Sequence, residues 1–247
     1  MNNFGIIIEA RMGSTRLPGK VLKKVYKNTT ALEFLLKRLS RKFGKELIII
    51  ATTLSKKDDT IVEYAQKNKY KFFRGSENNV CERVIKAAKF FKIQHIIEIT
   101  SDCILIDTNL IDDCLKVYKH HNVDYVSNCE IRSYPDGMDV QVFKLKSLIK
   151  SYRMIKSNYD KENVTTHIRR NKKKFSKINI FAPKKLTYPK LGLTLDTNED
   201  LRLIKKIIHH FYKIKNKSFD CEDIINFLNA NKSLLKINSH IKRNEIK

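Results

Sequence analysis

The chain has 247 residues, of which 42% are hydrophobic and 31% charged, a composition that excludes an intrinsically disordered protein. A net charge of +24 favours an anionic partner, which can be nucleic acid, an anionic membrane or a phosphorylated small molecule. The longest apolar runs are too short to span a bilayer and no secretory signal is evident, so we expect a cytoplasmic protein without a membrane span. Five scattered cysteines without a C-x-x-C pair indicate free thiols rather than disulfides or a zinc site.

Short apolar runs alternate with amphipathic segments through the first half of the chain. The runs predict strands at residues 4–9, 47–52 and 95–100, and the amphipathic segments predict helices at 31–43, 58–68, 78–91 and 109–120. Continuous apolar strands separated by helices are typical of a parallel sheet covered on both faces. The first half therefore predicts an α/β fold with three layers, in which a mostly parallel, twisted sheet lies between helices.

The pattern after residue 125 is more mixed. It predicts strands at 139–143, 177–181 and 193–196, and helices at 145–157, 162–171, 198–212 and 220–229. No internal repeat or linker divides the chain, so we expect one domain over residues 1–230. Residues 231–247 form a basic tail that we expect to fray.

The most informative segment follows the first predicted strand and runs from Glu9 to Lys20. It combines two glycines and small hydroxyl residues with three cations, Arg11, Arg16 and Lys20. Glycine lets backbone N–H groups approach anionic oxygens, and arginine can clamp phosphate oxygens with two hydrogen bonds. The spacing of a Walker A loop fails at Val21. The segment predicts a phosphate-binding loop, and a basic surface turn is the alternative.

Carboxylates follow two further predicted strands. Asp102 comes directly after the apolar run 95–100, and Asp196 ends the run 193–196. A carboxylate at a strand end near a phosphate loop suits Mg²⁺, which takes one or two carboxylates together with phosphate oxygens. Helix capping by Asp196 or Thr197 is the alternative at the second position, and capping is the favoured role of Asp107.

Six segments, in order along most of the chain, resemble motifs of the cytidylyltransferase superfamily that includes the acylneuraminate and 3-deoxy-manno-octulosonate enzymes. The closest resemblance is to its branch named after spore-coat polysaccharide biosynthesis, often labelled glycosyltransferase-like. The six segments are A-R-M-G-S-T-R-L-P-G-K at 10–20, G-S-E-N-N-V-C-E-R at 75–83, T-S-D-C at 100–103, P-D-G-M-D-V-Q-V-F at 135–143, E-N-V-T-T-H-I-R at 162–169 and L-T-L-D-T-N-E-D at 193–200.

The resemblance implies a nucleotidyltransferase domain, a Rossmann-like and GT-A-like fold, and roles for individual residues. The implied nucleotide-binding residues are Ala10, Arg11, Gly13, Ser14, Arg16, Lys20, Gly75, Arg83 and Ser101. The implied acceptor-binding residues are Asp136, Asp139, Gln141, His167 and Arg169. Asp102 and Asp196 are the implied Mg²⁺ ligands, and Arg11, Lys20 and Asp102 the implied catalytic residues. The sequence departs from the branch at Ser101 and Ile104, where it usually has Gly and Pro, at Asn78 and Asn79 in place of an acidic pair, and at Gln141 in place of Glu.

The function that the resemblance implies is transfer of CMP from CTP to a sugar-like or phosphorylated acceptor, with release of pyrophosphate, for surface-polysaccharide or capsule biosynthesis. It also implies a homodimer. A glycosyltransferase that uses a finished nucleotide sugar is the alternative within enzymes, although the usual Asp-x-Asp motif is missing. A nucleic-acid-binding protein is the alternative from another class; the charge favours it, whereas the lack of Trp and the placement of most Tyr and Phe in apolar segments do not.

Overall fold

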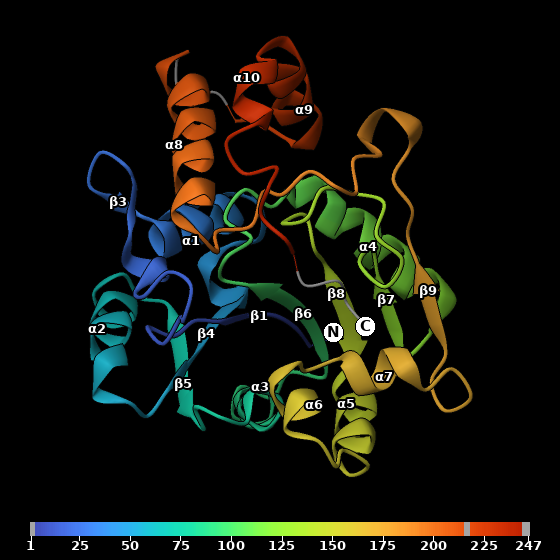
Figure 1. Cartoon of the computed structure of the whole chain (residues 1–247). Coiled ribbons are helices and arrows are strands. Elements are labelled where there is room, and N and C mark those ends of the chain that lie inside the picture. Colours follow the sequence, from blue (N-terminus) through green and yellow to red (C-terminus); the bar gives the residue numbers. More distant parts are fainter. Residues whose placement is uncertain (1–2, 215–217, 244–247) are drawn as a thin grey trace.

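A seven-stranded sheet in the order β5-β4-β1-β6-β8-β7-β9 runs through the computed structural model, which describes residues 3–214 and 218–243 (Figure 1). The sheet strands are β1 (Phe4–Glu9), β4 (Ile48–Thr53), β5 (Lys71–Gly75), β6 (His95–Thr100), β7 (Tyr125–Ser127), β8 (Gln141–Lys144) and β9 (Lys177–Asn179). A small separate hairpin is formed by β2 (Lys24–Tyr26) and β3 (Thr29–Thr30). The helices are α1 (Ala31–Phe43), α2 (Asp59–Lys67), α3 (Val80–Phe90), α4 (Thr108–His121), α5 (Leu145–Tyr152), α6 (Asn158–Glu162), α7 (Thr166–Arg170), α8 (Asn198–Lys213), α9 (Cys221–Ala230) and α10 (Lys232–Leu235).

The sheet is parallel from β5 to β6 and mixed beyond it. β1 lies between β4 and β6 and is parallel to both. β8 pairs antiparallel with β6 and β7, and β9 is parallel to β7. The carboxyl ends of β1 and β6 therefore meet at one edge, on two sides of the point where the strand order reverses, which is where open α/β sheets bind ligands.

Two apolar cores cover the two faces of the sheet. Alternate β1 residues serve them in turn, because successive side chains of a strand point to opposite faces. Ile6 and Ile8 pack in the larger core with α1, α2, α4, α8 and α9, and Ile7 packs in the smaller core with α3, α5 and α7. Figure 1 shows α3, α5, α6 and α7 together on one side of the sheet. The predicted three-layer α/β class is confirmed.

The strongly periodic elements match their predicted ranges closely. β1, α1 and β6 have the predicted bounds, and β4, α2, α3, α4, α8 and α9 shift by one or two residues. The predicted helix 145–157 ends earlier, at Tyr152, and the predicted helix 162–171 is shortened to α7 (Thr166–Arg170). The short helix α6 (Asn158–Glu162), which was not predicted, comes before it. Strands β5 and β7 were not predicted; they are short, and their sequences lack a clear alternation.

The predicted strand at 193–196 is wrong. The backbone hydrogen bonds of the segment go to two loops instead of a neighbouring strand. Leu195 N donates to Asp102 O at 3.0 Å, and Leu193 N donates to Asp136 O at 2.6 Å. Gly137 permits this close approach: its φ is +105°, and a Cβ there would lie 2.6 Å from the Leu193 carbonyl carbon.

The segment after α9 is ordered against the rest of the fold as far as Arg243, where we expected fraying. Asn238 is 4% exposed and donates to Gly192 O and to Asp200. Arg243 forms an ion pair with Asp200 at 2.7 Å. The polar composition of this stretch predicted a tail, but two of its polar side chains, Asn238 and Arg243, pair with the buried carboxylate of Asp200. The expected end of the domain at residue 230 stays a prediction.

All five cysteines are free and buried, as the sequence predicted. Burial raises the pKa of thiols such as Cys81, Cys129 and Cys221 to about 12, so they are inert at neutral pH. Among the described residues no helix is long and apolar enough to cross a membrane.

Candidate active site

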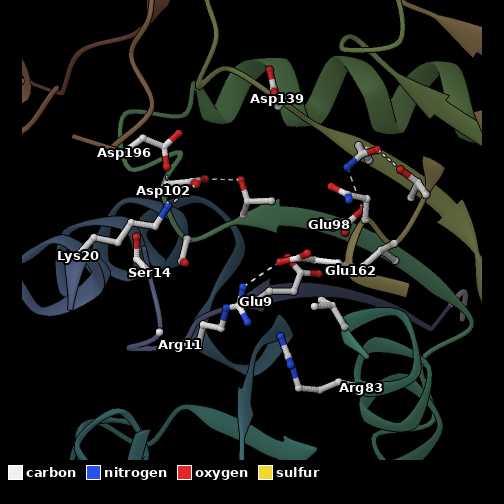
Figure 2. Close-up of a pocket in the computed structure, with 18 of the residues that line it drawn as sticks. Glu9, Arg11, Ser14, Lys20, Arg83, Glu98, Asp102, Asp139, Glu162 and Asp196 are labelled. Atoms are coloured by element: carbon white, nitrogen blue, oxygen red, sulfur yellow. Dashed lines mark hydrogen bonds and ion pairs between the residues drawn. The ribbon is translucent and has the colours of Figure 1, made fainter. Parts of the chain in front are cut away.

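A cavity of about 500 Å³ opens at the carboxyl ends of β1 and β6 and extends beneath them. Its walls come from the loop after β1, the turn after β6, the start of α3, strand β8, and the segment from α6 to α7. Figure 2 shows Lys20, Asp102 and Asp196 grouped on one side of it, with Arg11, Glu9, Glu98 and Glu162 farther along. The mouth of the cavity thus contains oppositely charged side chains, whereas a second polar region contains the two carboxyl groups of Glu9 and Glu98.

The loop after β1 is held in a compact shape by its own backbone. Gly19 N donates to Met12 O at 3.1 Å, and Leu17 N donates to the Ser14 hydroxyl at 3.3 Å. The buried Asp58 accepts from Met12 N at 2.7 Å and also from Thr53, which ties the loop to the end of β4. These bonds fix the backbone from which the cationic side chains of the loop extend. Such preorganisation is what a phosphate-binding loop requires.

Lys20, Asp102 and Asp196, with Arg16 beside them, form what we call the strand-end cluster. Lys20 Nζ donates to Asp102 Oδ2 at 2.7 Å and to Asp196 Oδ1 at 2.9 Å. Arg16 Nη2 lies 2.9 Å from Asp196 Oδ2. Residues separated by up to 176 positions in the chain therefore meet around one ammonium group.

The pKa values in this cluster follow from the pairing. Burial alone would raise the pKa of Asp102, but the Lys20 ammonium and the Thr100 hydroxyl, which donates at 2.6 Å, outweigh it and lower the pKa below its usual value. Burial alone would lower the pKa of Lys20, but Asp102 and Asp196 raise it. Lys20 and Asp102 are thus both charged at neutral pH.

Asp196 is positioned by a capping box at the start of α8. Asp200, fully buried, accepts from Asp196 N at 3.1 Å and Thr197 N at 3.0 Å, and Thr197 caps Asp200 N in return. The other carboxylate oxygen of Asp200 accepts from Asn238 at 2.8 Å and Arg243 at 2.7 Å. Of the two residues that the sequence offered as the cap, Asp196 and Thr197, it is Thr197 that caps α8, and the side chain of Asp196 faces the cavity.

Helix α6 and the segment before α7 close one wall of the cavity. Glu162, at the end of α6, forms an ion pair with Arg11 at 2.9 Å, and both side chains are partly exposed. The pair joins the phosphate loop to α6 (Figure 2). Thr165 and Arg169 line the same wall.

Glu9 and Glu98, which we call the floor pair, lie deeper, on the sheet face that α3, α5 and α7 cover. They follow Ile7 and Ile96 by two residues on adjacent strands and share their face. Glu98 Oε2 accepts from Gln141 Nε2 at 2.9 Å, and Gln141 Oε1 accepts from Tyr125 and Thr165.

The two carboxyl groups of the floor pair interact. Burial raises the pKa of Glu98 to about 7. Burial and then the neighbouring Glu98 raise the pKa of Glu9 well above its usual value. Two carboxylates in contact cannot both ionise at low cost, so a proton shared by the pair is favoured.

Most of the predicted site residues line this one cavity. The structure brings together Arg11, Gly13, Ser14, Arg16, Lys20, Arg83, Ser101, Asp102, Asp139, Gln141, Arg169 and Asp196. Four predicted residues lie outside its lining: Ala10, Gly75, Asp136 and His167. Ala10 is buried, Gly75 packs against the side chain of Arg83, Asp136 pairs with Arg132 and Arg243, and His167 contacts Ser151.

Sequence reasoning missed the floor pair, and it missed the roles of Glu162 and Thr165. Glu98 interrupts an otherwise apolar strand, H-I-I-E-I-T, and a charged residue at a core-facing position is a signal of function. Glu9 ends β1 and could have been read in the same way. Asp58 was assigned only to a helix start, because its partner Met12 is 46 residues away.

The fold and the site together define a class of protein. The sheet is mostly parallel, a cationic loop follows its first strand, and the carboxylates of Asp102 and Asp196 converge on that loop. This is the architecture of a nucleotidyltransferase. Residues 5–232 match the cytidylyltransferase family, and the chain belongs to it.

Relatives extend over nearly the whole chain. MJ1063 of Methanocaldococcus jannaschii, an uncharacterised protein, is 36% identical over 96% of this chain and 95% of its own length. The spore coat polysaccharide biosynthesis protein SpsF of Bacillus subtilis is 31% identical over 94% and 96%. Among solved structures, a cytidylyltransferase from Leptospira borgpetersenii is 33% identical and superimposes with a TM-score of 0.86, covering 98% of this chain and 99% of its own. The resemblance inferred from the motifs is confirmed.

Proposed function

We propose that the protein transfers CMP from CTP to an oxygen of a small sugar-like or anionic acceptor and releases pyrophosphate. The observation that carries this proposal is the strand-end cluster: one lysine ammonium held between two aspartates, directly beside the loop after β1. Family membership supports the reaction class. In the reaction, an acceptor oxygen forms a bond to the α-phosphorus as the bond to the pyrophosphate oxygen breaks.

The chain's own residues neutralise and align the triphosphate. Arg16 and Lys20 face the mouth of the cavity with their charges fixed by Asp196 and Asp102, and Arg11 stands beside them on the same loop. When phosphate oxygens replace the aspartates as partners of these cations, positive charge meets the negative charge that develops on the departing pyrophosphate. No covalent intermediate with the protein is required.

The residues of the cluster also fit Mg²⁺. Asp102 and Asp196 each place an oxygen within 3 Å of the same ammonium nitrogen, so the two carboxylates are close enough to hold one ion. Within the described part of the chain no three His, Cys, Asp or Glu residues gather as a closed metal cage. Two carboxylates with phosphate oxygens and water completing the shell is the arrangement that Mg²⁺ prefers. Bound there, the ion would supply further neutralisation of the triphosphate.

The biological setting follows from the relatives and is part of the proposal. SpsF acts in spore coat polysaccharide biosynthesis, as its name states, and this supports a role in making a surface polysaccharide or capsule. We further propose a homodimer, as the family resemblance implies, and a cytoplasmic location, as expected from the sequence composition.

A thermal-shift screen of the four nucleoside triphosphates, with and without Mg²⁺, tests the proposal, because a ligand that binds the native state raises its stability. We expect CTP with Mg²⁺ to give the largest shift, and Asp102→Asn to reduce the Mg²⁺-dependent part while the protein stays folded. Equal shifts with all four nucleotides, or a shift indifferent to Mg²⁺, would contradict it. Pyrophosphate release from CTP separates this reaction from glycosyl transfer, which releases none.

A further inference from the structure

The floor pair presents hydrogen-bond acceptors that lack partners. Both carboxylate oxygens of Glu9 are buried and accept no hydrogen bond from the described residues. Glu98 is 4% exposed; it accepts from Gln141 Nε2, and its other hydrogen-bond partner is the carboxyl group of Glu9. The amide of Gln141 is held in place by Tyr125 and Thr165, so it cannot turn to serve Glu9 as well. Leaving a carboxylate unpaired is costly, and such a group in a cavity indicates a ligand.

The same region of the cavity presents donors without partners. Nε and Nη1 of Arg169 are buried and have no hydrogen-bond partner among the described residues, and the same is true of Nε of Arg83. Arg169 lies close enough to Glu98, and Arg83 to Glu9, to lower the pKa of those carboxyls, though not enough to offset burial. The region thus places two carboxyl groups near two guanidinium groups, and it leaves both hydrogen-bond acceptors and hydrogen-bond donors without partners among the described residues.

This combination discriminates between ligand chemistries. A ligand with an anion alone can satisfy Arg169 but is repelled by the carboxylates. A ligand with hydroxyl groups alone can donate to Glu9, but it brings no positive charge to offset two ionised carboxylates. A protonated amine donates to both carboxylates and supplies the positive charge that lets both ionise.

We propose that the floor pair and Arg169 form the acceptor subsite, and that it selects an acceptor carrying a protonated amino group near an anionic group. The amine contacts Glu9 and Glu98, and the anion contacts Arg169. This inference rests on the proposed function. Glu98 lies two residues before the end of β6, about 7 Å along the strand, which a small amino-sugar phosphate can span to reach the triphosphate at the mouth.

Matched probes test the selection. Glucosamine 6-phosphate and glucose 6-phosphate differ in the amine, as do 2-aminoethyl phosphate and 2-hydroxyethyl phosphate. Binding of each is measured by isothermal titration calorimetry to protein saturated with Mg²⁺ and the unreactive α,β-methylene analogue of CTP. We expect the amine of at least one pair to bind about tenfold more tightly than its hydroxyl partner. Glu9→Gln and Glu98→Gln should bring the two members of that pair within about threefold. Glu63→Gln, on the exposed face of α2, is the charge-matched control and should keep the preference.

Each other outcome overturns the inference. It fails if hydroxyl members bind as tightly as amines, if no probe binds, or if the preference survives in both glutamine variants. Thermal shift by CTP with Mg²⁺ reports the proposed function separately. A protein that binds CTP and ignores the amines loses this inference alone, and one that fails to bind CTP loses the proposed function first. CTP binding by the two glutamine variants shows that they are folded.

Discussion

The two regions of the cavity handle charge in opposite ways. In the strand-end cluster every charge has a partner within 3 Å, and Lys20, Arg16, Asp102 and Asp196 neutralise one another. In the floor pair two buried carboxyl groups interact with each other, and the oxygens of Glu9 accept no hydrogen bond from the described residues. The first region is stable as it stands and must exchange partners when a triphosphate binds. The second is destabilised as it stands and gains most from a ligand. Removing a charge should therefore have opposite effects on stability in the two regions.

The largest effect is expected at the carboxylate that supports the strand-end cluster. Asp200→Ala removes four hydrogen bonds, leaves Arg243 and Asn238 without their buried partner, and frees the backbone of Asp196. We expect the free energy of unfolding to fall by about 4 kcal/mol, the usual cost of breaking a buried ion pair. Urea denaturation followed by circular dichroism measures it. Glu199→Ala in the same helical turn is the control and should change stability by less than about 0.5 kcal/mol. A similar small change for Asp200→Ala would show that the cluster does not depend on the C-terminal segment.

The opposite sign is expected in the floor pair, and it depends on pH. The pKa of Glu98 is about 7 in the folded protein against 4.5 in the unfolded chain, so unfolding between these pH values releases a proton. The contribution of Glu98 to the free energy of unfolding therefore falls as the pH rises from about 4.5 to about 7, by up to about 3 kcal/mol. The groups that face Glu98 are Glu9, Gln141 and Arg169. Glu98→Gln places an uncharged side chain among them and so mimics the protonated form of Glu98. The variant should be more stable than the wild type at pH 8 and similar to it at pH 5.

Denaturation at both pH values measures the difference, with Glu63→Gln as the control of equal charge. A variant less stable than the wild type at pH 8 would mean that Arg169 stabilises the Glu98 carboxylate more than burial and Glu9 destabilise it.

Sequence patterns predicted the strand-end region well because its information is local. The loop after β1 follows an apolar strand, and Asp102 follows another, so the fold brings them to one edge of the sheet. Periodicity fixed β1, α1 and β6 because each buries a continuous stripe. Asp196 was placed correctly although its strand was not. Its position depends on a helix cap and on two loops, and only the cap has a sequence signature.

The floor pair could not be assembled in the same way, because its contacts depend on strand order. Glu9 and Glu98 meet only because β1 and β6 are neighbours, and Gln141 reaches Glu98 only because β8 joins the sheet beside β6. The pairing of Asp200 with Asn238 and Arg243 spans about forty residues and carries no periodic signal. Residue types alone do not predict such contacts, because the contacts depend on the order of the strands in the sheet and on the path of the chain.

A third prediction tests whether Lys20 of the strand-end cluster binds the triphosphate. Lys20→Met should weaken the affinity for CTP with Mg²⁺ about thirtyfold, because one charge-assisted hydrogen bond to the triphosphate is lost. Isothermal titration calorimetry measures it, and Lys23→Met, an exposed lysine three residues on, is the control. Unchanged affinity in Lys20→Met would mean that Lys20 serves only to bridge Asp102 and Asp196. The strand-end cluster would then be a structural arrangement of charges and not a part of the nucleotide site.

The smallest effect is expected where the two regions meet, at the ion pair between Arg11 and Glu162. Both side chains are partly exposed, 33% and 58%, so the pair contributes little to stability, at most about 1 kcal/mol. It does occupy a cation of the phosphate loop. Glu162→Gln should release Arg11 for the triphosphate and tighten CTP binding by about threefold at low salt, with the gain disappearing as salt screens the original pair. Titrations at two ionic strengths measure this. Weaker CTP binding in Glu162→Gln would show instead that Glu162 holds Arg11 in its binding position, and that α6 belongs to the nucleotide region of the cavity.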